Sequence, residues 1–360
     1  MKKPVKRVLV ALTSVVAVIA LGLTATTVGN AVATTIEQDR IEPYGQKVTV
    51  DGHDMNVMIT GEGSEDIVLL PGFGTASPVL DFEPLVAELA RDHRVIVVEP
   101  FGYGLSDGTD RARTTDNIVT ETHAALQELG VDDYVLMGHS IAGIYGIQFA
   151  NRYPDEVRAF VGIDSSVPGQ PGSDTELPVA LFSAAKSLGL VRLIASFRGT
   201  GYDESVYSEK AREQIALLTD RNTLSPTYLN AMSLLPANFE DALGTSFPED
   251  LPLLLFVVAD NPSVPTGCGC TRSRPRRSLT ARSCRSTEST TSITPTRRGS
   301  STSSAPGSAR GCPPRSDVSQ RIEAAGAAGS QTSRSVSGWT EQSHDGYWRS
   351  RSARSGSATS

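Results

Sequence analysis

Residues 134–143 have the sequence Tyr-Val-Leu-Met-Gly-His-Ser-Ile-Ala-Gly, which places Ser140 between a short apolar run and a helical pattern. The run over residues 134–137 has the length of a buried strand, and residues 141–152 have the periodicity of a helix. Such a turn displays its serine outward on a strained backbone, and the small residues Gly138 and Ala142 let the chain pass closely. The pattern predicts that Ser140 is a nucleophile, whereas a serine that only caps a helix is the alternative.

The sequence on both sides of this turn alternates short apolar runs with longer amphipathic segments between residues 44 and 265. This alternation is typical of an α/β fold with a mostly parallel, doubly wound sheet, whose ligands bind at the carboxyl ends of the strands. We expect a hairpin of strands at residues 47–50 and 54–60, and further strands at 67–70, 94–98, 134–137, 159–163 and 251–258. We expect helices at residues 82–90, 115–129 and 141–152.

The strand signal is interrupted between residues 168 and 249, where helical stretches follow one another at 178–188, 208–219 and 226–234. A helical insertion inside an α/β sheet is usually a cap over the active site, because variable connections of such folds carry function. We therefore expect residues 168–249 to form a helical cap.

Three further segments fit the turn at Ser140. The residues Pro71-Gly72-Phe73-Gly74 follow one predicted strand, Glu99-Pro-Phe-Gly-Tyr-Gly-Leu-Ser-Asp (residues 99–107) follow the next, and Asp260 follows the last. In this order the four segments resemble the α/β-hydrolase superfamily, specifically its serine esterase/lipase branch with a helical cap, over about residues 45–265. Three positions depart from the family pattern: Pro71 stands where His is frequent, Glu99 where Asp is usual, and Ala142 where the turn usually ends in Gly.

The resemblance implies a role for each matched residue. Ser140 would attack the substrate, Asp260 would orient a catalytic histidine, and the backbone N–H groups of Phe73 and Ile141 would form the oxyanion hole. Asp164, which follows the preceding strand, is a competing candidate for the acid. The resemblance implies neither a cofactor nor a metal.

The histidine that such a triad needs has no good candidate in the chain. A serine hydroxyl is a poor nucleophile until an imidazole removes its proton, and the family places this histidine 25 to 40 residues beyond the acid. Only His344 follows Asp260, and it does so 84 residues later in a low-complexity segment. The other histidines are expected to be packing or surface residues: His53, His93, His123 and His139.

The composition changes abruptly near Gly267. Residues 267–360 hold 23 Ser, 15 Arg and 11 Thr but only five Leu, Ile or Val, too few to bury a core. All four cysteines lie in this segment, and its Gly-Cys-Gly-Cys start at residues 267–270 lacks a second ligand pair for a metal. Before Gly267 the chain has 18 basic and 35 acidic residues, which argues against nucleic acid as a partner.

Loss of periodicity with gain of Arg and Ser is what a GC-rich gene gives when it is translated out of frame. Shifted reading of plausible codons for residues 267–279 gives an amphipathic helix, and for residues 286–304 it gives a histidine loop followed by a helix. We therefore expect that residues 267–360 are a frameshifted product that has lost the catalytic His and the last helix. The alternative is a basic, disordered extension that binds acidic polymers or a cell envelope.

The N-terminus has the features of an export signal. Lys2, Lys3, Lys6 and Arg7 precede an apolar run from Val8 to Leu23, and a small-x-small motif ends at Ala33. The run is shorter than the roughly 20 residues of a comfortable span, but it becomes long enough when extended to Val28. Cleavage near Ala33 and retention as a membrane anchor both remain open.

The sequence therefore predicts an exported or membrane-anchored serine hydrolase that cleaves small carboxylic esters and does not bind nucleic acid. A nucleophilic serine disfavours the dehalogenases and epoxide hydrolases that use Asp. A peptidase or a cofactor-free haloperoxidase/perhydrolase of the same fold is the nearest alternative, and a catalytically dead binding or scaffold protein is another. The expected segments are a signal peptide or anchor (1–33), the first part of the core (45–167), the cap (168–249), the last strand and acid loop (250–266), and the tail (267–360).

Overall fold

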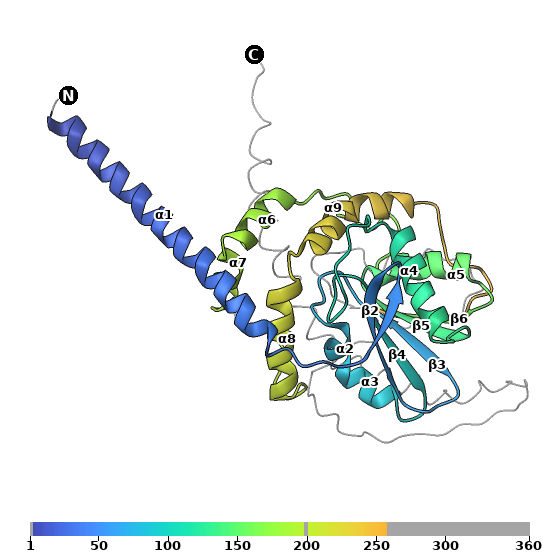
Figure 1. The fold of residues 1–360 in the computed structure, drawn as a ribbon. Coiled ribbons are helices and arrows are strands. Elements are labelled where there is room, and N and C mark those ends of the chain that lie inside the picture. The colour runs from blue at the N-terminus through green and yellow to red at the C-terminus, as the bar shows by residue number, and fades with distance from the viewer. Residues whose placement is uncertain (1–2, 198–200, 258–360) are drawn as a thin grey trace, which may run out of the picture.

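The computed structural model describes residues 3–197 and 201–257, and its centre is a seven-stranded sheet with the order β1-β2-β4-β3-β5-β6-β7 (Figure 1). Strand β2 is antiparallel to β1 and β4, and all other neighbours are parallel. The carboxyl ends of β3 to β7 therefore lie along one edge, as predicted for an α/β fold. The strands are β1 (Gln46–Val50), β2 (His53–Thr60), β3 (Asp66–Leu70), β4 (Arg94–Glu99), β5 (Tyr134–His139), β6 (Val157–Ile163) and β7 (Leu253–Phe256).

Helices cover both faces of this sheet. Because side chains alternate along a strand, Val68 and Leu70 of β3 pack into one core cluster, while Ile67 and Leu69 pack into another on the opposite face. The first cluster is closed by α4 (Thr115–Glu128) and α5 (Ala142–Arg152), and the second by α2 (Pro78–Asp81) and α3 (Glu83–Leu89).

In the described part of the insertion between β6 and β7, the chain forms four helices. They are α6 (Val179–Ser187), α7 (Leu190–Ala195), α8 (Glu209–Asn222) and α9 (Pro226–Asp241). Helix α7 was not predicted, and α9 continues through Pro236 to Asp241, whereas the predicted helix ended at residue 234. Proline removes a backbone donor, which usually ends a helix, but α9 continues because Asn238 and Phe239 beyond Pro236 are buried in the protein.

Helix α1 (Lys3–Gln38) extends away from the rest of the molecule as one continuous helix (Figure 1). Its stretch Val5–Gln38 has a mean hydropathy of up to 2.5 over 18 residues and is long and apolar enough to cross a membrane. A signal sequence satisfies the same criterion, so this finding alone does not decide between the two predicted fates of α1. The predicted acid Asp260 and the tail from residue 267 lie outside the described residues.

Candidate active site

Ser140 lies in the sharp turn between β5 and α5. Its φ of 52° is left-handed, a conformation that costs an L-residue roughly 1–2 kcal/mol. The turn is held on both sides, because the Ser140 N–H donates to the Ile163 carbonyl (3.1 Å) and the Ser140 carbonyl accepts from Gly143 (2.9 Å) and Ser166 (2.8 Å). The backbone thus imposes on Ser140 the strained geometry that its sequence context predicts.

Close packing around this turn explains its small residues. A Cβ atom on Gly138 would lie 2.9 Å from the Ala142 Cβ, and one on Gly143 would overlap the Ser166 carbonyl oxygen. A methyl group at position 142 fits because its neighbour at 138 has none. The departure from the family pattern at Ala142 is therefore accommodated.

The loop after β3 lies against the turn at Ser140. A Cβ on Gly72 would lie 2.6 Å from His139 Nδ1 and 3.2 Å from the Ser140 Cβ, so only glycine permits this approach. Among the described residues, neither Phe73 nor Ile141 donates its backbone N–H to an acceptor. Ile141 is also the N-cap of α5, where the helix dipole favours negative charge.

The segment after β4 supports the loop that contains Phe73. The Gly104 N–H donates to the Ala76 carbonyl (2.9 Å), and the Tyr103 hydroxyl is hydrogen-bonded to the backbone of Gly74. Burial raises the pKa of Tyr103 to about 12, which keeps its hydroxyl protonated.

Glu99 is hydrogen-bonded to both the segment after β3 and the segment after β4. One carboxylate oxygen accepts from the hydroxyls of Tyr44 and Ser77 (both 3.0 Å) and from the Val79 N–H (3.2 Å), and the other accepts from Asn56 Nδ2 (3.0 Å) and the Leu105 N–H (2.8 Å). The side chain is fully buried, and burial raises its pKa. The glutamate that replaces the family's aspartate is thus fully satisfied by hydrogen bonds.

No described histidine is placed as a base for Ser140. Among residues 3–197 and 201–257, no hydrogen bond joins the Ser140 hydroxyl to another side chain. The His139 ring faces the Gly72 backbone, and burial lowers its pKa although Asp164 opposes this effect. The other three have structural contacts: His123 pairs with Glu156 and stacks on Tyr153, His93 pairs with Glu65, and His53 packs against Phe101.

Of the two candidate acids, only Asp164 is described. It follows β6 with a φ of 43°, and its N–H donates to the Phe256 carbonyl at the end of β7 (2.7 Å). Asp164 and Ser140 therefore lie at the same edge of the sheet. Asp260 would follow β7 by four residues, and both it and His344 lie outside the described residues.

A small hollow, partly open to solvent, lies beside the Phe73 loop. It is bounded by the loops after β3 and β4 and by α4, α5 and α9, and Ser140 is not among its lining residues. Five of its twelve lining residues are aromatic, and the Phe73 ring packs on Tyr228 of α9 at 4.7 Å between centroids. The residues that line it are Pro71, Phe73, Pro100, Phe101, Gly102, Tyr103, Arg113, Ile118, Tyr145, Thr227, Tyr228 and Ala231.

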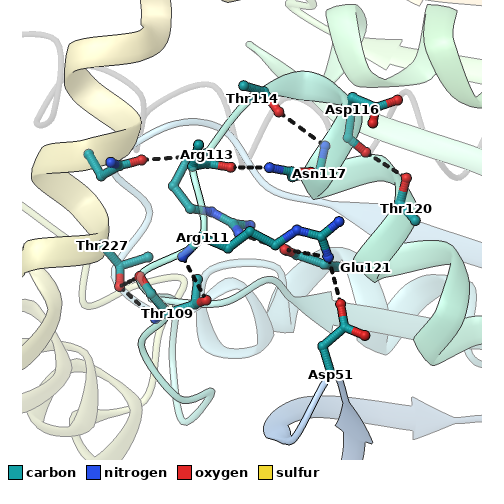
Figure 2. Close-up of polar contacts among 12 residues, drawn as sticks. Asp51, Thr109, Arg111, Arg113, Thr114, Asp116, Asn117, Thr120, Glu121 and Thr227 are labelled. Carbon is teal, nitrogen blue, oxygen red and sulfur yellow. Dashed lines mark hydrogen bonds and ion pairs between the residues drawn. The ribbon is translucent and has the colours of Figure 1, made fainter.

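Arg113 brings a buried charge to this hollow, and no pattern in the sequence predicted it. Figure 2 shows its ion pair with Glu121 (2.7 Å), beside which Arg111 bridges Glu121 (3.6 Å) and Asp51 (2.5 Å). Arg113 and Glu121 are only 2% and 1% exposed, so the pair is shielded from water. Arg113 lies in an aperiodic loop, and no local pattern marks such a residue as buried.

Comparison with known proteins agrees with this architecture. Residues 67–243 match the family model of the alpha/beta hydrolase fold. The Bacillus subtilis protein YbdG is 30% identical over 230 residues, which cover 59% of this chain and 68% of that protein. The chain belongs to the α/β-hydrolase family. The predicted family and fold are therefore confirmed.

Other members of the α/β-hydrolase family are more distant. The "Putative non-heme haloperoxidase" of Mycobacterium phage D29 is 27% identical over 48% of this chain and 61% of its own length. The 2-(acetamidomethylene)succinate hydrolase of Mesorhizobium japonicum is 29% identical over 33% of this chain and 42% of its own. The chain thus spans less than two thirds of these two relatives. The solved epoxide hydrolase VrEH1 of Vigna radiata is 19% identical, with a TM-score of 0.47 over 59% of this chain and 78% of that chain.

The described part of this α/β hydrolase has no candidate metal centre. Within residues 3–197 and 201–257, no group of three or more His, Cys, Asp or Glu side chains could hold a metal ion.

Proposed function

We propose that this α/β hydrolase is a serine hydrolase that cleaves carboxylic esters, with Ser140 as its nucleophile. The observation that carries the proposal is the left-handed backbone of Ser140 at the β5–α5 turn, next to two N–H groups without acceptors. Such strain is retained where it serves to display a reactive group. The Ser140 oxygen would bond to the acyl carbon, the alcohol would leave with a proton, and water would then release the acid.

The developing oxyanion would be stabilised by the N–H groups of Phe73 and Ile141. Removal of one such donor costs about 3–4 kcal/mol of transition-state stabilisation in comparable sites. Asp260 is the proposed acid that orients the histidine, with Asp164 as the alternative because it lies at the same edge as Ser140.

The proton of Ser140 needs an acceptor, and we propose that the chain as written lacks it. The four described histidines do not bond Ser140. In a related triad, loss of the histidine costs about 10⁶ in kcat. The proposed frameshift near residue 267 would account for this loss, and a read of the source DNA across the codons for residues 264–304 tests it directly.

The function is tested with two chains, the one printed here and one in which a single-nucleotide shift restores the reading frame after residue 266. Hydrolysis of short p-nitrophenyl esters and labelling by a fluorophosphonate are measured for both, with Ser140→Ala as the matched control. We expect ester turnover and Ser140-dependent labelling in the restored chain and little of either in the other. Equal labelling of the restored chain with and without Ser140→Ala would rule out Ser140 as the nucleophile.

A cofactor-free haloperoxidase or perhydrolase is the second candidate, since the phage relative is named a putative non-heme haloperoxidase. It predicts bromination of monochlorodimedone in hydrogen peroxide and acetate at a rate that exceeds aryl-ester turnover. A peptidase would instead cleave proline amides. Inertness in all of these assays, in both chains, would leave a binding or scaffold protein.

We further propose that the catalytic domain is exported and stays at the membrane. The support is α1, whose apolar stretch is exposed to the surroundings along its length, with Val10 64% and Leu21 70% exposed. Basic residues at its start, Lys3, Lys6 and Arg7, would stay on the cytoplasmic side. Fractionation after an alkaline carbonate wash tests this, since a cleaved and secreted domain would remain in the soluble fraction.

A further inference from the structure

The last turns of α1 are bound to the inserted helices by one arginine. Arg192 of α7 donates from Nε to the Asn30 side chain (3.0 Å), from Nη1 to the Glu37 carboxylate (2.6 and 2.7 Å), and from Nη2 to the Thr34 hydroxyl (3.3 Å). These three residues share one face of α1, since they are spaced by about one helical turn. The Nη1 atom also pairs with Asp220 of α8 (2.9 Å), so the contact joins three helices.

The chain near the end of α1 also contacts the inserted helices on both sides of the residues that bind Arg192. Gly189, just before α7, lies so close to α1 that a Cβ there would overlap the Thr26 carbonyl oxygen. Beyond α1, Gln214 of α8 accepts from the Glu42 N–H (2.9 Å) and donates to the Arg40 carbonyl (3.1 Å). Residues 26–42 therefore dock on the insertion as an integral part of the fold, and cleavage after Ala33 would divide that contact.

The position of this contact along α1 defines where a membrane would end. Residues 8–28 are apolar or weakly polar, and at 1.5 Å per residue they span about 31 Å, close to the roughly 30 Å of a bilayer core. Gly189 meets α1 at Thr26, within the last turn of that span. The turn between α6 and α7 therefore lies level with the outer boundary of the lipid.

The surface of the insertion at this level has the composition of a lipid contact. Leu181 of α6, Leu193 and Ile194 of α7, and Phe197 after it are 65%, 44%, 40% and 83% exposed. Residues 177–202 contain no Asp or Glu, although acidic residues outnumber basic ones almost two to one before Gly267. A segment that lacks Asp and Glu and exposes apolar and aromatic side chains is typical of helices that lie in a membrane interface.

We propose that α1 is retained as an anchor and that Leu181, Leu193, Ile194 and Phe197 form a second contact with the bilayer, embedded at its outer interface. This inference rests on the membrane location proposed above but not on the identity of the nucleophile. Figure 1 shows α6, α7 and α8 between α1 and the sheet. The insertion, including Tyr228 of α9 at the hollow, would then lie between the lipid and the catalytic edge of the sheet, a position suited to amphiphilic esters taken from the bilayer.

The first arm of the test measures the mass of the membrane-bound protein after export. The full mass, or that of the full chain without its initiator methionine, is expected. A fragment that begins at Thr34 would overturn the proposal, because α1 would then be a cleaved signal.

The second arm measures lipid contact at one position. Phe197→Trp and Leu243→Trp are each reconstituted in phosphatidylcholine–phosphatidylglycerol vesicles with and without dibrominated phosphatidylcholine. Leu243 is a matched control, since it is 57% exposed but lies after α9. Both variants carry the same natural tryptophans, Trp339 and Trp348, so the difference between them reports the new residue.

Brominated lipid is expected to quench the added emission of Phe197→Trp and to leave that of Leu243→Trp unchanged. Equal quenching of the two variants, or a blue-shifted but unquenched Trp at position 197, would overturn the lipid contact, the latter in favour of a protein partner such as a second copy. The same measurement in a Ser140→Ala background should give the same quenching, so failure of the proposed hydrolase activity does not obscure the result.

Discussion

The free energy of unfolding of the wild-type protein is expected to decrease as the pH rises from about 4 to about 6. Replacing Asp81 by Asn should abolish that decrease. Asp81 ends α2, where its carboxylate accepts from the Tyr202 hydroxyl (2.9 Å) and its carbonyl accepts from the Tyr207 hydroxyl (2.8 Å). Both tyrosines belong to the segment before α8. The carboxyl is thus enclosed where the inserted helices meet the core, and burial raises its pKa from 3.8 to about 6.

The sign follows from the direction of this pKa shift. The folded state binds the Asp81 proton more tightly than the unfolded state, so its contribution to stability is fully present below pH 3.8 and is lost as the pH rises through 6. Each unit of pKa difference corresponds to 1.36 kcal/mol, so the loss is at most about 3 kcal/mol. Asn cannot titrate, so the variant should lack this component.

Urea unfolding followed by circular dichroism from pH 3.5 to 7 measures the effect as the difference between wild type and Asp81→Asn. Other carboxylates titrate equally in both chains and cancel in that difference. Asp203→Asn is a control of opposite sign, because hydrogen bonds from Ser205 lower the pKa of Asp203. A difference between wild type and Asp81→Asn that is independent of pH, or that favours wild type as the pH rises, would refute the reasoning.

Substitutions at four positions give further tests of the site, most of them by urea unfolding. In the chain with the restored reading frame, Ser140→Gly and Ser140→Ala should both lose fluorophosphonate labelling. The Gly variant should be more stable than the Ala variant by about 1 kcal/mol because glycine relieves the left-handed strain, and a more stable Ala variant would contradict this. Glu99→Gln should cost about 2–4 kcal/mol, since an amide nitrogen would face donors, and an unchanged midpoint would argue against the network. Glu121→Ala should cost about 3–5 kcal/mol by leaving Arg113 buried and unpaired, whereas the double variant Arg113→Met/Glu121→Leu should recover most of that loss. Gly143→Ala should disrupt the turn at Ser140, and the expected results are a lower melting temperature and, in the chain with the restored reading frame, weaker fluorophosphonate labelling.

Much of the core was predictable because it depends on local patterns. The runs that became β3, β4, β5 and β6 are short and apolar, and each ends in a turn that the sequence marks with Gly, Pro or Ser. The turn at Ser140 was predictable for the same reason, since strand, turn and helix are contiguous in the chain. Helix α7 was missed because it is only six residues long and follows directly after Gly189.

The contacts that the sequence could not predict join distant segments. The donors to Glu99 come from positions as far apart as Tyr44 and Leu105, and none of them lies in a pattern that signals an acceptor. Arg192 meets Glu37 across 155 residues. Both pairings depend on how the chain packs in three dimensions, and the amphipathic period of α7 gives no information about α1.

The insertion between β6 and β7 also has a consequence for synthesis of the chain. Strand β6 ends at Ile163 and its partner β7 begins at Leu253, so 89 residues must be made before that edge of the sheet can be paired. At about 5–20 residues per second, this takes roughly 4–18 s. During that interval β6 presents a row of unpaired N–H and C=O groups, which is a template for pairing with another chain. A ribosome that pauses within the insertion would therefore hold a nascent chain whose sheet edge at β6 is unpaired and prone to aggregation. The yield of folded protein would then depend on chaperones that cover that edge.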